Sequence, residues 1–121
     1  MEIEHIEDRK GQDVVDCDGK KIGTLEDVYF EAGLRKAIFG CVKSDTLGQR
    51  HLLVPLTGAS VSRDHVRVAY PRDQVKVGPQ IEPGATLKLM TAQELAYHYQ
   101  IELTPLPAAG NPRYESARAR P

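Results

Sequence analysis

Residues 16–31 read DCDGKKIGTLEDVYFE and place five carboxylates and two glycines in sixteen positions. Such a density of acids fits either a loop that holds a cation or a tight turn followed by a strand. A calcium loop of the EF-hand type needs oxygen ligands at positions 1, 3 and 5, glycine at position 6 and glutamate at position 12. Counted from Asp16, positions 5, 6 and 12 are Lys20, Lys21 and Asp27. The pattern fails where the geometry is most demanding, and we expect no metal site here.

The other interpretation is a β-hairpin. Asp18 and Gly19 form a turn dipeptide between two apolar runs, and both are expected to supply positive φ angles. A glycine inside a strand often marks a bulge or a close approach of two backbones, so Gly23 predicts a bend in the sheet. Asp27 leaves two interpretations open. It is either a buried carboxylate bonded to backbone donors at the bend or a solvated charge, and the solvated charge is favoured.

Short apolar runs separated by turn residues continue after residue 31. Gly33 and the stretch 45–48 predict turns, and Pro55 is expected at a strand end or edge because it has no N–H for a ladder. In HVRVAY the alternation predicts one buried and one exposed face. Five or six short strands, with no room for crossover helices, favour a small antiparallel β-barrel. The runs are KAIFGCVKS (36–44), HLLVPL (51–56) and HVRVAY (65–70).

The C-terminal part has a different pattern. Pro71 predicts the start of a single helical turn, which an extended connector follows. Residues 91–100 predict a helix, with Thr91 as N-cap and Glu94 bonding back to it in a capping box. From Thr104 onward, four prolines and a small excess of arginine predict a disordered or partner-dependent tail.

Composition limits the function classes. Sixteen basic and seventeen acidic residues give a formal net charge of −1, which disfavours general nucleic-acid binding. The first thirty residues are acidic and lack an apolar run, unlike a secretory signal, and no segment approaches the roughly 18 apolar residues of a membrane span. We therefore expect a soluble, cytoplasmic protein.

Cysteine and histidine usage predicts no metal or redox site. Cys17 and Cys41 are too far apart for a Cys-x-x-Cys motif, and both are expected to be reduced and packed. The four histidines lack ligand spacing. No cofactor is expected.

Three segments, in this order, resemble one known family. They are GQDVVDCDGKKIGTLEDVYFE (11–31), LLVPL (52–56) and VRVAYPRDQVKVGP (66–79). Together they resemble the PRC-barrel domains, a family named for the cytoplasmic part of the photosynthetic reaction-centre H subunit. ELAYHYQI (94–101) is similar to the short helix that follows the barrel in many members. The residues that carry the signature are Asp18, Gly19, Ile22, Gly23, Asp27, Val54 and Pro55.

The resemblance implies a small, mostly antiparallel barrel of about six strands that acts as a binding or adaptor module. In the reaction centre such a domain caps the membrane complex and assists proton delivery to a quinone, and in a ribosome-maturation factor a similar domain accompanies a protein-binding domain. Within these 121 residues we expect no counterpart of the membrane helix of the first or of the partner domain of the second. No proton-relay carboxylate is carried over to a numbered position.

No motif in the sequence predicts catalysis. A Gly-x-Ser-x-Gly elbow and a phosphate-binding Gly-x-x-x-x-Gly-Lys loop are both absent, and RDH (63–65) is interpreted as an exposed turn. Tyr97 and Tyr99 lie two residues apart on the predicted helix and should point to different sides, so at least one is expected to anchor the helix. We expect no enzyme.

Four segments are predicted: a polar N-terminal arm (1–10) docked through Ile3 and Ile6, a barrel core (11–79), a connector with a docking helix (80–103) and a flexible tail (104–121). The leading hypothesis is a protein-binding, self-associating module, a homo-oligomer whose protein partner is unknown. One alternative is an RNA- or ribosome-associated factor that uses the basic tail, and another is an accessory protein to photosynthetic or redox machinery. Candidate partner contacts are Tyr97, Tyr99, Arg113, Arg118 and Arg120.

Overall fold

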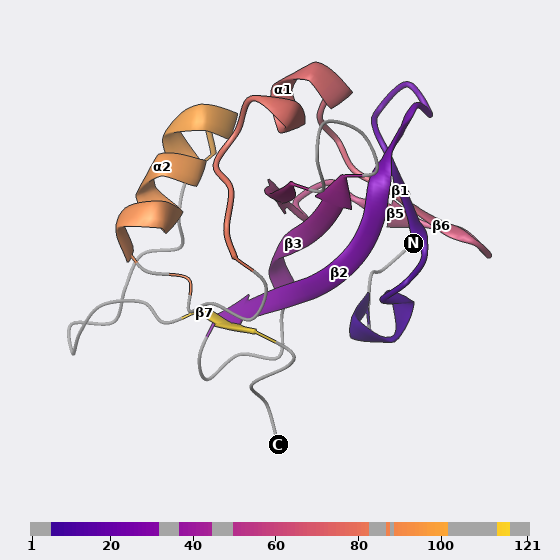
Figure 1. The fold of residues 1–121 in the computed structure, drawn as a ribbon, viewed down its shortest axis with the longest axis horizontal. Helices are drawn as coiled ribbons and strands as arrows, with labels where there is room; N and C mark the ends of the chain where they lie inside the picture. The colour runs from indigo at the N-terminus through magenta and orange to yellow at the C-terminus, as the bar shows by residue number, and fades with distance from the viewer. Residues whose placement is uncertain are drawn as a thin grey trace.

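The computed structural model describes residues 6–31, 37–44, 50–82, 87, 89–101 and 114–116. In these residues the chain is mainly β, as predicted, with a short helix near the C-terminus (Figure 1). The strands are β1 (Asp13–Val15), β2 (Lys21–Glu31), β3 (Ala37–Ser44), β4 (His51–Pro55), β5 (Ser60–Val61), β6 (His65–Arg67) and β7 (Tyr114–Ser116). The helical elements are a short 3₁₀ helix η1 (Ile6–Arg9), α1 (Arg72–Lys76) and α2 (Leu89–Tyr99).

Six strands follow the order β4-β3-β2-β1-β6-β5, and β7 pairs with β2 off this path. The neighbours are antiparallel except for β1 and β6, which are parallel. The mostly antiparallel sheet predicted from the sequence is therefore present, with this one pair as the exception. A parallel pair needs a long connection, and here the chain passes through β2 to β5 before it returns. In the described residues β4 and β5, the two ends of this order, are not paired, so the sheet is barrel-like but open.

The longest strand, β2, is bent by two bulges. Ile22 is an extra residue relative to β1, and Glu26 is an extra residue relative to β3. Between them, a Cβ added at Gly23 would lie 2.1 Å from the backbone oxygen of Lys43. The bend and the close approach predicted at Gly23 are both confirmed, and Figure 1 shows β2 curving along the sheet.

The turn between β1 and β2 has a three-residue loop. The N–H of Asp16 donates to the carbonyl of Lys20 (2.8 Å), and the N–H of Gly19 donates to the carbonyl of Asp16 (3.0 Å). Gly19 has a φ of +86°, whereas Asp18 does not have a positive φ. The predicted hairpin is confirmed, but only one of the two expected positive φ angles is present. A three-residue loop needs a single left-handed residue at its last position.

The two cysteines differ in environment. Cys41 lies in β3 and is buried, whereas Cys17 is exposed in the β1–β2 loop, and neither forms a disulfide. The expectation that both are packed is therefore wrong for Cys17. Its apolar neighbours in the sequence belong to β1, and the chain has already turned at Cys17.

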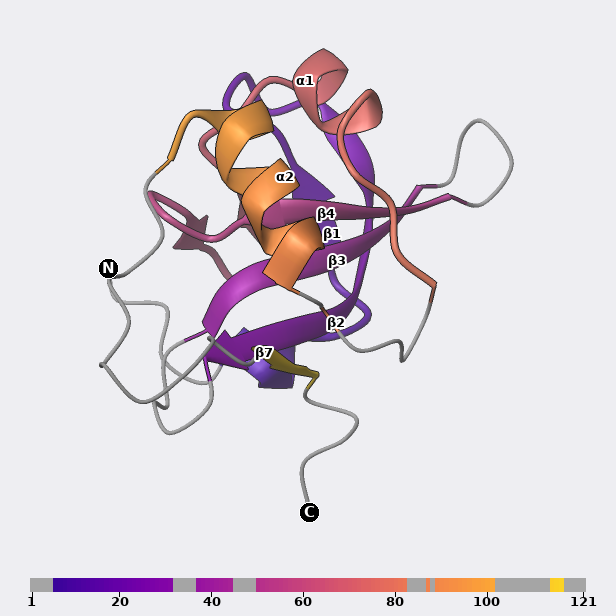
Figure 2. The ribbon, with the colours of Figure 1, turned by 90° about the vertical axis from the view of Figure 1, so that its left-hand side faces the viewer.

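The core lies between the inner face of the sheet and α2, which Figure 2 shows lying across β4 and β3. Burial of Ile6 confirms that the N-terminal arm docks through this residue. The largest fully buried side chains include Tyr29, Phe39, Ile6, Leu25, Leu52, Leu53, Leu87 and Leu95.

The outer edge of β4 is covered by the connector after α1. The N–H of Leu53 donates to the carbonyl of Pro79 (3.1 Å), and the N–H of Ile81 donates to the carbonyl of His51 (3.0 Å). Val54 is buried in this strand, and Pro55 is its last residue, as predicted.

Helix α2 begins two residues earlier than predicted. Thr91 is its third residue and not its N-cap, because Leu89 and Met90 are good helix formers that continue the helix past the capping pattern. At the other end Gln100 has a φ of +54°, and the N–H of Ile101 donates to the carbonyl of Ala96 (2.9 Å). This is a Schellman ending, with glutamine in the place where glycine is usual.

Helix α1 is the predicted single turn, and it begins directly after Pro71. It is joined to α2 by two reciprocal hydrogen bonds. The side-chain amide of Gln74 donates to the carbonyl of His98 (3.2 Å), and Nε2 of His98 donates to the carbonyl of Gln74 (2.7 Å).

Several predicted features lie outside the described residues: Ile3, the turns at Gly33 and 45–48, and most of the tail. Within the tail, Tyr114–Ser116 form β7, antiparallel to β2. The sequence pattern does not predict this strand. It forms where β2 extends beyond β1 and presents an edge for pairing.

Candidate functional site

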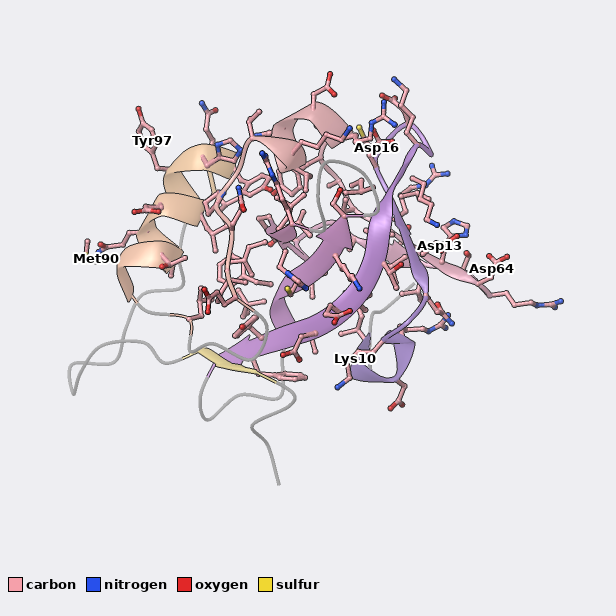
Figure 3. The ribbon with its side chains drawn as sticks, in the orientation of Figure 1. Lys10, Asp13, Asp16, Asp64, Met90 and Tyr97 are labelled. Atoms are coloured by element: carbon pink, nitrogen blue, oxygen red, sulfur yellow. The ribbon has the colours of Figure 1, made fainter. Side chains whose placement is uncertain are left out.

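The carboxylate of Asp16 is buried beside the β1–β2 turn, at the hairpin end in Figure 3. Its Oδ1 accepts hydrogen bonds from the backbone N–H groups of Asp18 (2.9 Å) and Lys20 (2.8 Å). Its Oδ2 accepts a third from the N–H of Arg72 (2.8 Å), the first residue of α1. One side chain therefore shapes the turn and satisfies an N–H at the start of a helix.

These contacts determine the charge state of Asp16. Burial alone would raise the pKa of this carboxyl. The backbone N–H groups of Arg72, Lys20 and Asp18, with the charge of Lys20, outweigh burial and hold the pKa below its usual value. Asp16 is therefore ionised, and its charge stabilises the β1–β2 turn and the start of α1.

Asp27 is also buried, and its Oδ1 accepts a hydrogen bond from the N–H of Val28 (2.9 Å). The favoured prediction of a solvated charge is wrong, and the alternative of a buried carboxylate with a backbone donor holds. The bulge at Glu26 interrupts the alternation of side chains along β2, so a simple inside–outside pattern does not apply to Asp27. In the described part of the chain, no group of three or more His, Cys, Asp or Glu residues is placed to hold a metal ion.

Ser62, Asp64 and His65 come together at the β5–β6 turn. Ser62 Oγ lies 2.8 Å from Nδ1 and 3.2 Å from Nε2 of His65, and Asp64 Oδ1 lies 3.0 Å from Nδ1. A catalytic triad needs the carboxylate on one ring nitrogen and the nucleophile on the other. The hydrogen bond from His65 lowers the pKa of the exposed Asp64, as it would in any surface pair. Here Ser62 Oγ lies closer to Nδ1, the nitrogen that faces Asp64, than to Nε2, so the cluster has the residue types of a triad but not its division between the two ring nitrogens.

The two tyrosines of α2 have opposite environments, as predicted. Tyr99 is buried, its hydroxyl donates to the carbonyl of Leu53 (2.8 Å), and its ring meets that of Tyr70 edge to face at 4.7 Å. Burial and the neighbouring Tyr70 raise the pKa of Tyr99 well above its usual value. Tyr97 is 88% exposed. Tyr99 anchors the helix and only Tyr97 is accessible to a partner.

Large exposed apolar side chains in the described residues all belong to the helical side of the molecule. They are Val77 at the end of α1 (77% exposed), and Met90 (73%) and Tyr97 on α2. Met90 and Tyr97 are seven residues apart, hence two helical turns along one face, and Figure 3 shows both pointing outward. We call Val77, Met90 and Tyr97 the helical apolar face.

The remaining predicted contacts, Arg113, Arg118 and Arg120, lie outside the described residues. Sequence reasoning did not identify Val77, Met90 or the role of Asp16. The seven-residue spacing of Met90 and Tyr97 was an available signal, and so was the position of Asp16 two residues before Asp18, which is typical of an Asx turn.

A family model, described as the PRC-barrel domain, matches residues 1–75, more than half of the chain. The chain belongs to the PRC-barrel family. The predicted resemblance is thereby confirmed, and the matched PRC-barrel region contains β1 to β6. The helical apolar face, α2 and β7 all follow it in the sequence. A comparison with curated proteins finds no match. Among the described residues of this PRC-barrel protein, no helix is long and apolar enough to cross a membrane.

Proposed function

We propose that this PRC-barrel protein is a non-catalytic binding module that self-associates through the helical apolar face. The observation that carries the proposal is the position of Val77, Met90 and Tyr97. All three are large, apolar and more than 70% exposed, and all three follow the matched barrel region. Large apolar side chains that are exposed together on one side of a helix, as Met90 and Tyr97 are, are typical of a protein interaction site.

The face is rigidly supported, which favours binding. Tyr99 fixes the inner side of α2 to β4, and the reciprocal bonds between Gln74 and His98 fix α2 to α1. A side chain presented on a rigid element loses less entropy on binding. Full burial of one such side chain contributes about 1.5–3 kcal/mol, and tyrosine is enriched among residues that dominate binding energy.

A second copy is the partner that we propose. Each copy presents the same face, so two copies can meet across a two-fold axis with Met90 and Tyr97 of each packed against the other. Glu94 is also exposed on α2 and lies between Met90 and Tyr97 along the helix. It would form a polar edge of the contact between the two copies.

Three placements support a non-catalytic role. In the Ser62, Asp64 and His65 cluster, the serine and the carboxylate both lie nearest to the same ring nitrogen, and the carboxylates of Asp16 and Asp27 face backbone donors. Cys17 and Cys41 form no disulfide, which is compatible with the reducing cytoplasm that we propose as the location of the protein.

Light scattering over a series of protein concentrations tests the proposal. We expect the weight-average mass of the wild type to rise with concentration, and that of the Met90→Ser/Tyr97→Ser variant to stay at the monomer value. Arg63→Ser, an exposed polar change in the β5–β6 turn, is the control outside α2 and should behave as the wild type. A wild type that stays monomeric throughout, or a double variant that associates equally well, contradicts the proposal.

A further inference from the structure

One edge of β2 is shared by two strands. β1 pairs with the first part of β2, at residues 21–24, and β7 pairs with its end, while β3 occupies the opposite edge. The register of the second contact is Glu31↔Tyr114, Phe30↔Glu115 and Tyr29↔Ser116. The end of β2 is therefore a site where an extended strand adds to the sheet through backbone hydrogen bonds.

The strand at this site differs from the segment that covers the other long edge. The connector that covers the edge of β4 comes directly after α1 in the sequence. The Gln74–His98 hydrogen bonds hold α1 to α2, so this connector starts from a fixed element. β7 is only three residues long, and twelve residues separate it from Ile101, which ends the Schellman motif of α2. A three-residue strand makes few ladder hydrogen bonds, so it opens more readily than the core strands.

We propose that β7 is exchangeable between copies: the end of β2 accepts β7 from its own chain or from a second copy of this chain. A second copy presents the same strand in the same register, so exchange replaces each hydrogen bond with an identical one. The twelve-residue connection spans about 40 Å when extended, which is enough to reach a neighbouring molecule. This surface is separate from the helical apolar face, and the exchange goes beyond the self-association proposed above.

The connection also sets the concentration at which exchange occurs. A tethered strand has an effective concentration on the order of millimolar at its own site. The closed chain is therefore the main species in dilute solution, and the exchanged form grows in proportion to protein concentration.

Cysteine trapping in the full-length chain distinguishes the two forms. In a Cys17→Ser background, which removes the exposed thiol, one chain carries Glu31→Cys and another carries Tyr114→Cys. Residues directly opposite in an antiparallel pair have Cβ atoms about 4.5–5.5 Å apart, within reach of a disulfide or a short thiol-bridging reagent. Mixing the two chains should give a cross-linked heterodimer. The fraction of chains cross-linked per unit time should rise about tenfold for a tenfold rise in protein concentration.

Two matched controls complete the experiment. The double variant Glu31→Cys/Tyr114→Cys should close within one chain at a rate independent of concentration. Thr24→Cys, in the part of β2 that pairs with β1, should not cross-link to the Tyr114→Cys chain. Adding Met90→Ser/Tyr97→Ser should leave the concentration dependence of cross-linking in place, which separates this proposal from the one above.

Proline substitutions in the Tyr114→Cys chain test whether cross-linking needs the ladder. Hydrogen-bonded pairs alternate along an antiparallel ladder, so either Glu115→Pro or Ser116→Pro removes an N–H that points at β2. At least one of the two should reduce heterodimer formation about tenfold. If the double variant closes but the mixed chains give no more heterodimer than the Thr24→Cys control, β7 does not exchange. If neither the double variant nor the mixture cross-links, the strand-addition site itself is absent. Either result overturns the proposal.

Discussion

Oδ2 of Asp16 lies 2.8 Å from the backbone nitrogen of Arg72, and this hydrogen bond joins the β1–β2 turn to the start of α1 across 56 positions of sequence. The same carboxylate also bonds Asp18 and Lys20 within its own turn. A single buried anion thus fixes the hairpin end relative to the helical side that carries the proposed binding face.

Replacing Asp16 by alanine should lower the free energy of unfolding by about 2–3 kcal/mol, because three backbone donors lose a charged acceptor. Chemical denaturation measures the change. Asp18→Ala, an exposed position in the same turn, is the matched control and should change stability by less than about 0.5 kcal/mol. Equal losses in the two variants would contradict the role of Asp16.

The contribution of Asp16 should depend on pH in a defined direction. Its pKa in the folded protein lies below the ordinary value of 3.8, so the folded state binds fewer protons there than the unfolded state. The stability that it adds is fully present above the unfolded pKa and is lost as pH falls through the folded pKa. The difference in unfolding free energy between the wild type and Asp16→Asn should therefore be constant near neutral pH and shrink below pH 3.8. A difference that grows on acidification would have the wrong sign.

Gly23→Ala should be strongly destabilising, by several kcal/mol, because the added Cβ meets the backbone oxygen of Lys43 at 2.1 Å and the backbone must move. Gly19→Ala is the useful comparison. Its Cβ has no neighbour closer than 3.8 Å, so the cost is that of a left-handed residue, about 1–2 kcal/mol. Thermal unfolding of both variants measures the order, and a smaller loss at Gly23 than at Gly19 would refute the close approach.

Tyr99→Phe and Tyr97→Phe should differ although they are the same chemical change on one helix. Loss of the Tyr99 hydroxyl leaves the buried carbonyl of Leu53 without this donor and should cost about 1–2 kcal/mol of stability. Tyr97 is exposed, so loss of its hydroxyl should be close to neutral. Denaturant midpoints of the two variants test this contrast, and equal midpoints would argue against Tyr99 as the anchor of α2.

Local rules predicted much of the fold. The Asp18–Gly19 dipeptide predicts a hairpin because few residues adopt a left-handed conformation, and Pro55 predicts a strand end because it lacks an N–H. Gly23 predicts a close backbone approach for a similar steric reason. Each prediction depends on one residue and its neighbours, so no knowledge of the tertiary structure is needed.

The features that escaped prediction depend on residues far apart in the chain. Asp16 caps α1 only because the hairpin end folds next to Arg72. β7 forms only because β2 extends beyond β1, and β1 and β6 are parallel only because the chain returns after four other strands. The capping-box pattern at Thr91 did not mark the start of the helix, because the helix continues toward the N-terminus through Leu89 and Met90.

The most direct test of the central claim is to map the contact itself. Backbone amide chemical shifts of the isotope-labelled protein, recorded from dilute to concentrated solution, should change mainly on the outward side of α2 around Met90 and Tyr97 and next to Val77. These changes should vanish in the Met90→Ser/Tyr97→Ser variant and persist in Arg63→Ser. Spectra that do not depend on concentration, or changes confined to the sheet, would contradict self-association through the helical apolar face.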